Sequence, residues 1–367
     1  MKKLTRRWLK RELYKAYLEA RKHKRHTKDV YLFEQNLEAN LDQLCEDLFM
    51  RRYKPSRGIA FIIKVPVMRE IFAAPFRDRI VHHFLYNMSY YWWDRRLEND
   101  SYSCRKGRGT LFGIKRLQHF IKSVSRDYTQ KAYVVKLDIQ GYFMSLSRKK
   151  LYERVCWGLD MQFSEERSMR GFLKYIWGEV IFDDPCKGVF IRGSKKDWRR
   201  LPRSKSLFRQ PPGFGIVIGN LSSQLLSNIY LDALDRYVVH ELGYKAYGRY
   251  VDDFFIVVDE AHLAQLKEDV KKIERFLKEE LCLTLHPNKR YLQEAHKGVE
   301  FLGTVIYPGH IGVTRRFKNN FYKAAAEVSM GYRDVASMAS YLGLAKHYDV
   351  MKLAKDVFEW YGWDYYY

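Results

Sequence analysis

The chain alternates between stretches with apolar residues at helical spacing and short runs of β-branched and aromatic residues. Helical spacing dominates the start, where helices are expected over residues 4–24 and 29–49. Residues 58–74, GIAFIIKVPVMREIFAA, change to strand character and predict a hairpin with Pro66 near its turn or on an edge. A long helix is then expected from Phe76. Both kinds of periodicity in one chain indicate a fold that mixes helices and strands.

The second half of the chain predicts a sheet whose strands are separated by helices. The expected strands are short β-branched and aromatic runs, at residues 132–139, 244–250, 254–258, 283–289 and 301–309. The expected helices carry large apolar residues every three or four positions, at residues 111–120, 151–178, 221–242, 263–281 and from 315 onward. The last strand is expected to close the sheet before the C-terminal helices begin.

Two aspartates fall between two of these strands, in Tyr250-Val251-Asp252-Asp253. Both carboxylates are expected at a tight turn, as the charged tip of a hairpin. Adjacent aspartates repel each other and cannot be buried without a partner, so a pair on a rigid hairpin favours a bound cation. Mg²⁺ prefers oxygen ligands and is the expected ion. For these four residues alone, a polar turn without metal is the alternative.

A third carboxylate, Asp138, ends the expected strand 132–139. Two-metal phosphoryl chemistry needs carboxylates from more than one strand, because two ions about 4 Å apart must be held from both sides. The aromatic pair Tyr142-Phe143 follows it. A flat ring beside the sugar of an incoming nucleotide can exclude a 2′-hydroxyl by its bulk, and ordinary core packing is the alternative for each ring.

Composition narrows the class of partner. The 66 Lys and Arg residues exceed the 43 Asp and Glu residues, and the formal charge of +23 implies an anionic polymer that binds less tightly as salt rises. No stretch approaches the roughly 20 apolar residues of a membrane span, and no apolar signal core follows the basic N-terminus, so a cytoplasmic location without a membrane partner is expected. The five scattered cysteines are expected to be reduced and mostly buried, without a zinc site.

Seven blocks along nearly the whole chain resemble, in order, those of a reverse transcriptase. The blocks are REIFAAPFRDRIVHHFL, SYSCRKGRGT, VKLDIQGYF, IGNLSSQLLSNIYLDALD, YVDD, LHPNK and FLG. The fourth block narrows the resemblance. Its Ile218-Gly219-x-x-x-Ser223-Gln224 is similar to the enzymes of diversity-generating retroelements, whereas most relatives have Gln-Gly-x-x-x-Ser-Pro.

The resemblance implies an α+β fold of the right-hand polymerase type, with fingers, an antiparallel-sheet palm and a short helical thumb. The expected regions are a basic helical N-terminus at 1–57, fingers at 58–131, a palm at 132–310 with a basic insertion at about 183–212, and a thumb at 311–367. The insertion carries many Lys and Arg residues and is expected at the surface. It could bind template RNA or an accessory protein, and a solvated loop without a partner is the alternative.

The implied activity is that of an RNA-directed DNA polymerase, encoded by a bacterium or a phage, that makes error-prone cDNA with adenine-directed mutations from a template-repeat RNA. Asp138, Asp252 and Asp253, with the carbonyl of Ile139, would hold two Mg²⁺ ions, for which Mn²⁺ can substitute. The implied partners are template RNA, the primer and cDNA, deoxynucleoside triphosphates and a small basic accessory protein that relatives bind as a pentamer.

The remaining expected site residues surround the nucleotide or contact nucleic acid. The nucleotide residues are Lys64, Arg69, Tyr142, Phe143, Ile218, Gly219, Gln224 and Lys289. The nucleic-acid residues are Arg79, Arg105, Lys106, Arg108, Arg315 and Arg316. The resemblance implies that Ile218 and Arg69 loosen the selection of the incoming nucleotide opposite a template adenine. It also implies that Lys289 protonates the departing pyrophosphate. A solvated surface position is the alternative for each cation.

Two other functions remain open. The first is an ordinary bacterial reverse transcriptase of the group II intron, retron or phage-defence type, which fidelity at template adenines would distinguish. The second is a non-catalytic RNA-binding scaffold on a polymerase fold, and the presence of all three aspartates weighs against it.

Overall fold

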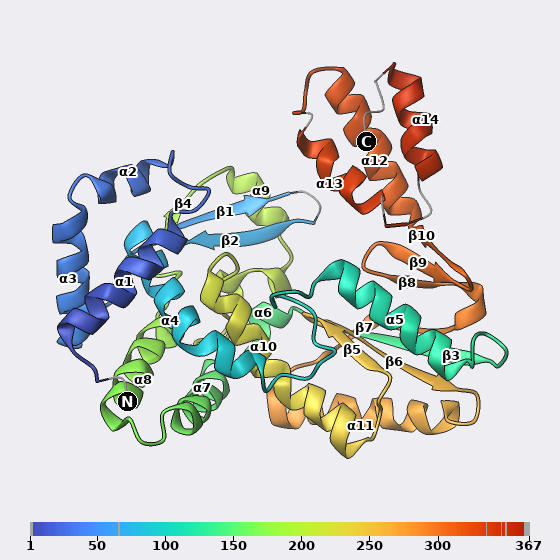
Figure 1. The fold of residues 1–367 in the computed structure, drawn as a ribbon, viewed down its shortest axis with the longest axis horizontal. Coiled ribbons are helices and arrows are strands. Elements are labelled where there is room, and N and C mark those ends of the chain that lie inside the picture. The colour runs from blue at the N-terminus through green and yellow to red at the C-terminus, as the bar shows by residue number, and fades with distance from the viewer. Residues whose placement is uncertain (1–2, 65–66, 335, 346, 349–350, 363–367) are drawn as a thin grey trace.

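The computed structural model describes residues 3–64, 67–334, 336–345, 347–348 and 351–362. In Figure 1 the N-terminal helices lie on the left, a four-stranded sheet lies at the lower right, and the C-terminal helices lie at the upper right. The mixture of helices with antiparallel strands confirms the α+β class. Within the described ranges, none of the helices combines the length and the apolar composition of a membrane span.

The N-terminal region is a group of helices packed on one long helix. The elements are α1 (Arg6–Ala20), α2 (Lys28–Glu34), α3 (Leu37–Phe49) and α4 (Phe76–Asp94). The helix expected over 29–49 is wrong in one respect, because it breaks between α2 and α3, where Asn36 has the non-helical angles φ −130° and ψ 46°. Leu41, Leu44 and Leu48 form the buried stripe of α3. These three leucines contribute to the core of the N-terminal group.

The expected hairpin is confirmed as β1 (Ile59–Ile63) and β2 (Arg69–Ala73), which pair antiparallel. Pro66 lies outside the described residues. A third strand, β4 (Phe190–Ile191), pairs parallel with β1 and belongs to the expected basic insertion. A two-residue strand is too short to produce a periodic pattern, so the sequence predicted only a loop there.

The four-stranded sheet, called the central sheet below, has the order β5-β6-β3-β7 with every neighbouring pair antiparallel. Its strands are β3 (Ala132–Ile139), β5 (Tyr247–Tyr250), β6 (Asp253–Asp259) and β7 (Leu285–Glu294). Alternate residues face opposite sides: Val135 and Leu137 enter the core shared with α10 (Leu221–Arg236) and α11 (Leu263–Leu281), whereas Val134 packs with α5 (Thr110–Val124).

The strand expected to close the sheet does not join it, and that prediction is wrong. Residues 299–313 form a separate sheet of order β10-β9-β8. Tight turns at Leu302-Gly303 and Gly309, all with positive φ, join consecutive strands and pair them with each other. Its strands are β8 (Val299–Phe301), β9 (Thr304–Tyr307) and β10 (His310–Val313).

The remaining helices connect these sheets or follow them. They are α6 (Tyr142–Ser145), α7 (Arg148–Gln162), α8 (Arg167–Phe182), α9 (Lys195–Arg200), α12 (Arg315–Ser329), α13 (Ala336–Ala345) and α14 (Met351–Tyr361). The last three confirm the expectation of helices after residue 315. The expectation for the cysteines was wrong in part, because only Cys45 is buried whereas Cys104 and Cys282 are exposed.

Candidate active site

Two of the three aspartates face each other across neighbouring strands. Asp138 near the end of β3 is paired in register with Asp253 at the start of β6. Residues directly opposite in an antiparallel pair have Cβ atoms about 5 Å apart, on the same face of the sheet. The backbone N–H of Ile139 donates to the carbonyl of Asp252 at 3.1 Å, which ties the third aspartate to the same strand end. Residues 114 positions apart in sequence therefore meet at one edge of the central sheet.

The turn that carries Asp252 has an unusual backbone. Tyr250 pairs with Asp253, so Val251 and Asp252 form a two-residue connection. The expectation that both carboxylates sit in the turn is therefore corrected: Asp252 lies in the turn and Asp253 begins the strand. Val251 has φ +59°, a conformation that costs a β-branched residue on the order of 1–3 kcal/mol.

A buried arginine holds that turn. Arg249 on β5 is fully buried, and its Nε and Nη2 donate to the two carboxylate oxygens of Asp235 at 2.7 and 2.6 Å. Its Nη1 donates to the carbonyl of Val251 at 2.9 Å. The hydroxyl of Tyr247 donates to Asp235 at 2.5 Å. Arg249 was not among the predicted site residues, although a charged residue inside an apolar strand next to the aspartates was a usable signal.

Asp252 and Asp253, at the turn between β5 and β6, are half-buried and have raised pKa values. Burial, with the negative charge of Asp138, raises the pKa of Asp252 to about 6. Burial also raises the pKa of Asp253 to about 6, against the opposing charge of Lys136. The other two carboxylates add to this increase for Asp253. The local excess of negative charge favours a cation at this edge.

Two lysines supply positive charge there. Lys289 on β7 lies with its ammonium 2.7 Å from Oδ2 of Asp138. The expected role of Lys289 beside the reacting phosphates stays a prediction. Lys136 precedes Asp138 by two positions and lies on the same face, with its ammonium 4.6 Å from the centre of the Tyr291 ring. Burial lowers the pKa of Lys136, and the charge of Asp253 opposes that change. The strand period of two could have identified Lys136.

The donor set suits a hard cation, since carboxylate oxygens are the ligands that Mg²⁺ and Mn²⁺ accept. As the side chains stand, no group of three or more His, Cys, Asp or Glu side chains among the described residues is gathered closely enough to hold a metal ion. Asp138 instead contacts Lys289. A bound ion would therefore compete with Lys289 for the carboxylate of Asp138. The side chain of Ile139 is buried, so only its carbonyl could contribute.

The segment before α10 lies against the β1–β2 hairpin. The N–H of Phe72 on β2 donates to the carbonyl of Ile218 at 3.0 Å. Gly219 has φ +130°, and a Cβ there would lie 2.7 Å from the carbonyl oxygen of Phe72, so this close approach requires glycine. The side chain of Ile218 is half-buried in the apolar cluster of Ala60 and Phe72. Gln224 is exposed on the first turn of α10.

The two rings after Asp138 have different environments. Tyr142 is buried, and its hydroxyl donates to the carbonyl of Ser227 at 2.7 Å, so the expectation that it contacts nucleotide is corrected to core packing. Phe143 is half-buried and remains the ring that can border a nucleotide sugar. Sequence could not separate the rings, because their burial depends on the short helix α6.

The hairpin cations differ in their surroundings. Arg69 is exposed at the start of β2, and its positive charge opposes the increase in the pKa of Asp252. Lys64 is exposed directly after β1 and pairs with Asp197 at 3.0 Å. Both residues stay predictions as phosphate ligands. To bind a phosphate, Lys64 would have to break its ion pair with Asp197.

The expected nucleic-acid cations are not equivalent. The expectation for Arg105 is corrected, because its side chain is buried and bound to Asp94 at 2.7 Å and to three backbone carbonyls. Arg108 donates to Asn99, and Arg79 donates to the carbonyl of Ala74 at 2.8 Å. Three exposed cations keep the expected role as a prediction, namely Lys106, Arg315 and Arg316.

A cavity of about 330 Å³ lies between the hairpin and the start of α10. His82, Arg148 and Asp183 line it, and none of the three site aspartates does. Inside it, Oγ of Ser222 and Nδ1 of His82 are hydrogen-bonded at 2.7 Å. This cavity joins α4 to α10 and is separate from the carboxylate edge.

Comparison with known proteins gives a family and a fold. Residues 68–306 match the model of the reverse transcriptase (RNA-dependent DNA polymerase) family. None of the curated proteins compared with the chain matches it. Among solved structures, the chain is similar to apo telomerase from Candida tropicalis truncated from its C-terminal domain, with a TM-score of 0.51, 11% identity and coverage of 70% of this chain and 55% of that one.

Two further telomerase structures are similar. Apo telomerase from Candida tropicalis gives a TM-score of 0.50 at 12% identity, covering 78% of this chain and 51% of that chain. Telomerase from Candida albicans in complex with a TWJ fragment of telomeric RNA gives 0.49 at 13% identity, covering 92% and 60%. The chain thus spans between half and two thirds of these telomerase chains. The family match, with the likeness to the two Candida tropicalis structures, confirms the expected right-hand fold.

Proposed function

Because the chain belongs to the reverse transcriptase (RNA-dependent DNA polymerase) family, we propose that it is an RNA-directed DNA polymerase. In this reaction a primer 3′-hydroxyl attacks a deoxynucleoside triphosphate along an RNA template. The observation that carries the proposal is the pairing of Asp138 with Asp253 across β3 and β6, with Asp252 in the adjoining turn. The family match includes all three aspartates, and their meeting at one edge of the central sheet favours catalysis over a non-catalytic scaffold.

We propose that the carboxylates of Asp138, Asp252 and Asp253, with the carbonyl of Ile139, hold two Mg²⁺ ions, for which Mn²⁺ can substitute. Such ions, when bound, orient the attacking and leaving oxygens and stabilise the charge that develops on the phosphoryl group. Lys289 would then be released from Asp138 and donate a proton to the departing pyrophosphate. Arg69 would hold the triphosphate.

The finer proposal is an enzyme of a diversity-generating retroelement, cytoplasmic and encoded by a bacterium or a phage. Its support is the block Ile218-Gly219-x-x-x-Ser223-Gln224. An apolar Ile218 cannot donate or accept a side-chain hydrogen bond, and its backbone carbonyl is bonded to Phe72 of the β1–β2 hairpin. We propose a template-repeat RNA as template. The small basic pentameric accessory protein would join through that RNA, because this chain is itself strongly basic.

Primer extension on an adenine-containing RNA tests these proposals, with wild type compared with Asp252→Ala. The expected result is Mg²⁺-dependent cDNA with errors concentrated opposite adenines and no product from the variant. Equal fidelity at all four bases would assign the chain to the ordinary bacterial reverse transcriptases. Absence of product from the wild type in Mg²⁺ and in Mn²⁺ would favour the scaffold.

A further inference from the structure

Residues 183–212, called the basic segment below, carry an uncompensated positive charge. After Asp184 the segment has nine Lys and Arg residues and a single acid, Asp197. All nine are exposed, and among the described residues no carboxylate forms an ion pair with any of them. Asp197 pairs with Lys64 of the hairpin. A surface with this many positive charges and so few negative ones favours the binding of a polyanion.

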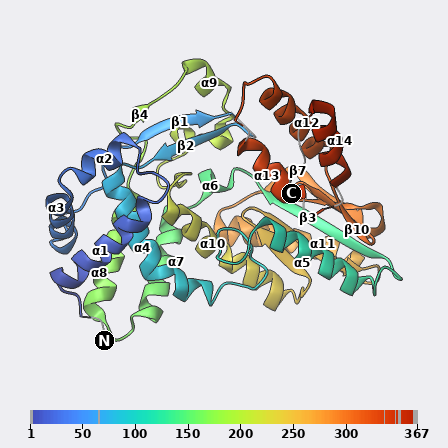
Figure 2. The ribbon, with the colours of Figure 1, turned by 45° about the horizontal axis from the view of Figure 1, so that its top comes forward.

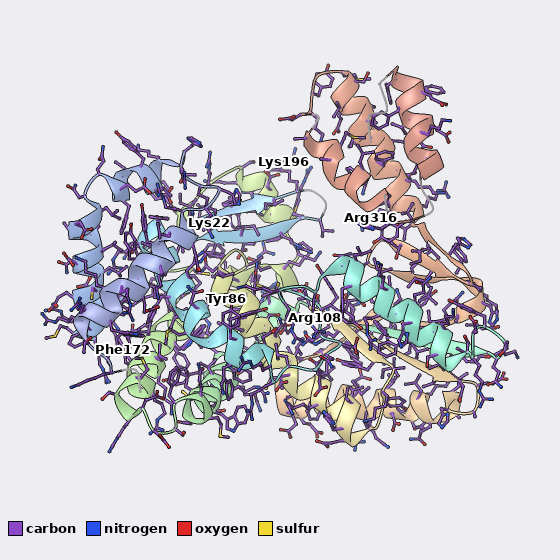
Figure 3. The ribbon with its side chains drawn as sticks, viewed as in Figure 1. Lys22, Tyr86, Arg108, Phe172, Lys196 and Arg316 are labelled. Carbon is purple, nitrogen blue, oxygen red and sulfur yellow. The ribbon has the colours of Figure 1, made fainter. Side chains whose placement is uncertain are left out.

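The basic segment runs from the outer side of the β1–β2 hairpin to the edge of the central sheet that carries the three aspartates. It begins beside β1, where Phe190 pairs with Ile59. Further along, a Cβ added to Gly141 would lie 2.7 Å from the carbonyl oxygen of Ser204, and Gly141 follows Asp138 by three positions. Figure 2 shows α9 and β4 on the outer side of the β1–β2 hairpin, and Figure 3 labels Lys196 on α9.

The segment is anchored well enough to act as a platform. Leu207 is buried in the cluster with Phe72 and Met144. Its N–H donates to Oε1 of the fully buried Glu70 at 2.9 Å. The exposed cations are therefore mounted on a backbone fixed to the hairpin and to the end of β3.

Apolar and aromatic side chains accompany the charge. Phe190 is 78% exposed and Ile191 is 57% exposed, although both lie in a strand. Next to them is a cavity of about 260 Å³ lined by Phe61, Trp198 and Arg192. Exposed rings beside cations are the means by which proteins bind unpaired bases, because every base has a flat face that stacks.

We propose that the basic segment binds single-stranded RNA, with its cations on the phosphates and with Phe190 and the cavity at Trp198 on the bases. This strand is the unpaired template on its way to the carboxylates, an assignment that rests on the proposed function. A single nucleoside triphosphate is too small to contact nine cations spread along the segment. An acidic protein would match the charge but would leave the flat rings unexplained.

The test is equilibrium binding of fluorescein-labelled DNA primer on RNA, with an unpaired RNA 5′ overhang of about ten nucleotides or with a blunt end. The variant is Arg192→Ala/Lys195→Ala/Lys196→Ala. Its matched control is Lys267→Ala/Arg275→Ala/Lys278→Ala on α11, which removes the same charge from exposed positions below the central sheet. Unchanged thermal melting of both variants would show that folding is intact.

The expected result is affinity for the overhang substrate about tenfold weaker and a slope against log salt shallower by about two, with blunt-ended binding and the control unchanged. Phe190→Ala is expected to weaken overhang binding several-fold, and Phe190→Trp to restore it. Equal affinity of the triple variant and wild type for the overhang would overturn the proposal. An equal loss on the blunt substrate, or a higher nucleotide KM with unchanged overhang affinity, would do the same.

The assay needs neither metal nor nucleotide. If the chain binds overhangs as described but extends no primer, the proposed polymerase activity is overturned and the RNA-binding proposal stands. A chain that extends primers but ignores these substitutions would sink the platform alone.

Discussion

Arg249 Nη1 donates a hydrogen bond of 2.9 Å to the carbonyl oxygen of Val251, the residue with the strained backbone before Asp252. The same guanidinium is held by both carboxylate oxygens of Asp235 on α10. The position of the catalytic turn is thus set by a buried ion pair behind it. Arg249 is a positioning residue, since its side chain contacts the backbone of the turn and not the carboxylates of Asp252 and Asp253.

Replacing Arg249 with Met should lower both stability and turnover. Breaking a buried ion pair leaves Asp235 charged without its cation, with only the hydroxyl of Tyr247 still donating to it, and costs about 3–5 kcal/mol. We also expect kcat to fall at least about a hundredfold, because Asp252 loses its fixed position. Single-turnover primer extension and primer–template affinity are the measurements, and affinity should stay within about twofold.

Arg154→Met is the matched control. Arg154 pairs with the buried Asp232 at 3.0 Å, on helices that do not carry the turn. It should destabilise the protein and leave kcat near the wild-type value at a temperature where both variants are folded. Equal loss of kcat in the two variants would mean that Arg249 acts only through stability.

Lys289→Ala should slow chemistry more than it weakens binding. The ammonium of Lys289 lies at Asp138, and loss of a proton donor typically costs a factor of about 10²–10⁴ in rate. Neighbouring Arg290, which pairs with Glu274 instead, provides the control as Arg290→Ala. Rapid-quench measurement of kcat and nucleotide KM distinguishes the roles. A rise in KM alone would assign Lys289 to phosphate binding rather than proton transfer.

Phe143 and Tyr142 predict opposite phenotypes. Phe143→Ala should increase incorporation of ribonucleotides relative to deoxynucleotides by about ten- to a hundredfold, because the half-buried ring is removed from the sugar side. Tyr142→Phe should leave sugar selection unchanged and cost about 1 kcal/mol, the value of its hydrogen bond to Ser227. Competition between the two sugars on one template measures both. Altered selection in Tyr142→Phe alone would reverse the assignment.

Sequence periodicity was sufficient for the elements that face a core on one side. β3 and α11 have the predicted bounds because their alternation is regular over eight or more residues. Periodicity could not place the break at Asn36, nor the pairing of β4 with β1, since neither depends on local pattern. The register of Asp138 against Asp253 is a property of the assembled sheet.

The site was predictable to the extent that its carboxylates could be recognised, and its cations much less so. Arg105 and Arg249 are both buried, and each is satisfied by an aspartate more than ten residues away in sequence. Whether an arginine faces solvent or an internal carboxylate depends on partners that only folding brings close. The loop at residues 101–109 therefore contains Arg105, which supports the structure, and Lys106, which is exposed.

The contact between His82 and Ser222 predicts an acid-sensitive stability. Burial lowers the pKa of His82 to about 4, with the charges of His83 and Arg79 acting in the same direction. Between about pH 6.5 and 4 the unfolded chain takes up a proton on His82 that the folded chain does not, so the free energy of unfolding falls as pH falls through this window. The loss amounts to up to about 3 kcal/mol.

Urea unfolding at several pH values, for wild type and His82→Gln, measures that loss. The variant should have a shallower pH dependence in this window, whatever its absolute stability. Exposed His119→Gln should keep the wild-type slope. Identical slopes for wild type and His82→Gln would contradict the buried neutral histidine.

The central claim is that three carboxylates at one edge of the central sheet act together on divalent cations, and single-turnover primer extension in Mg²⁺ tests it most directly. The variants are Asp138→Asn, Asp252→Asn and Asp253→Asn, with Asp259→Asn at the other end of β6 as control. Each of the three should lose at least about 10³-fold in rate. The control should stay within about twofold of wild type. Near wild-type extension by any of the three would contradict the account.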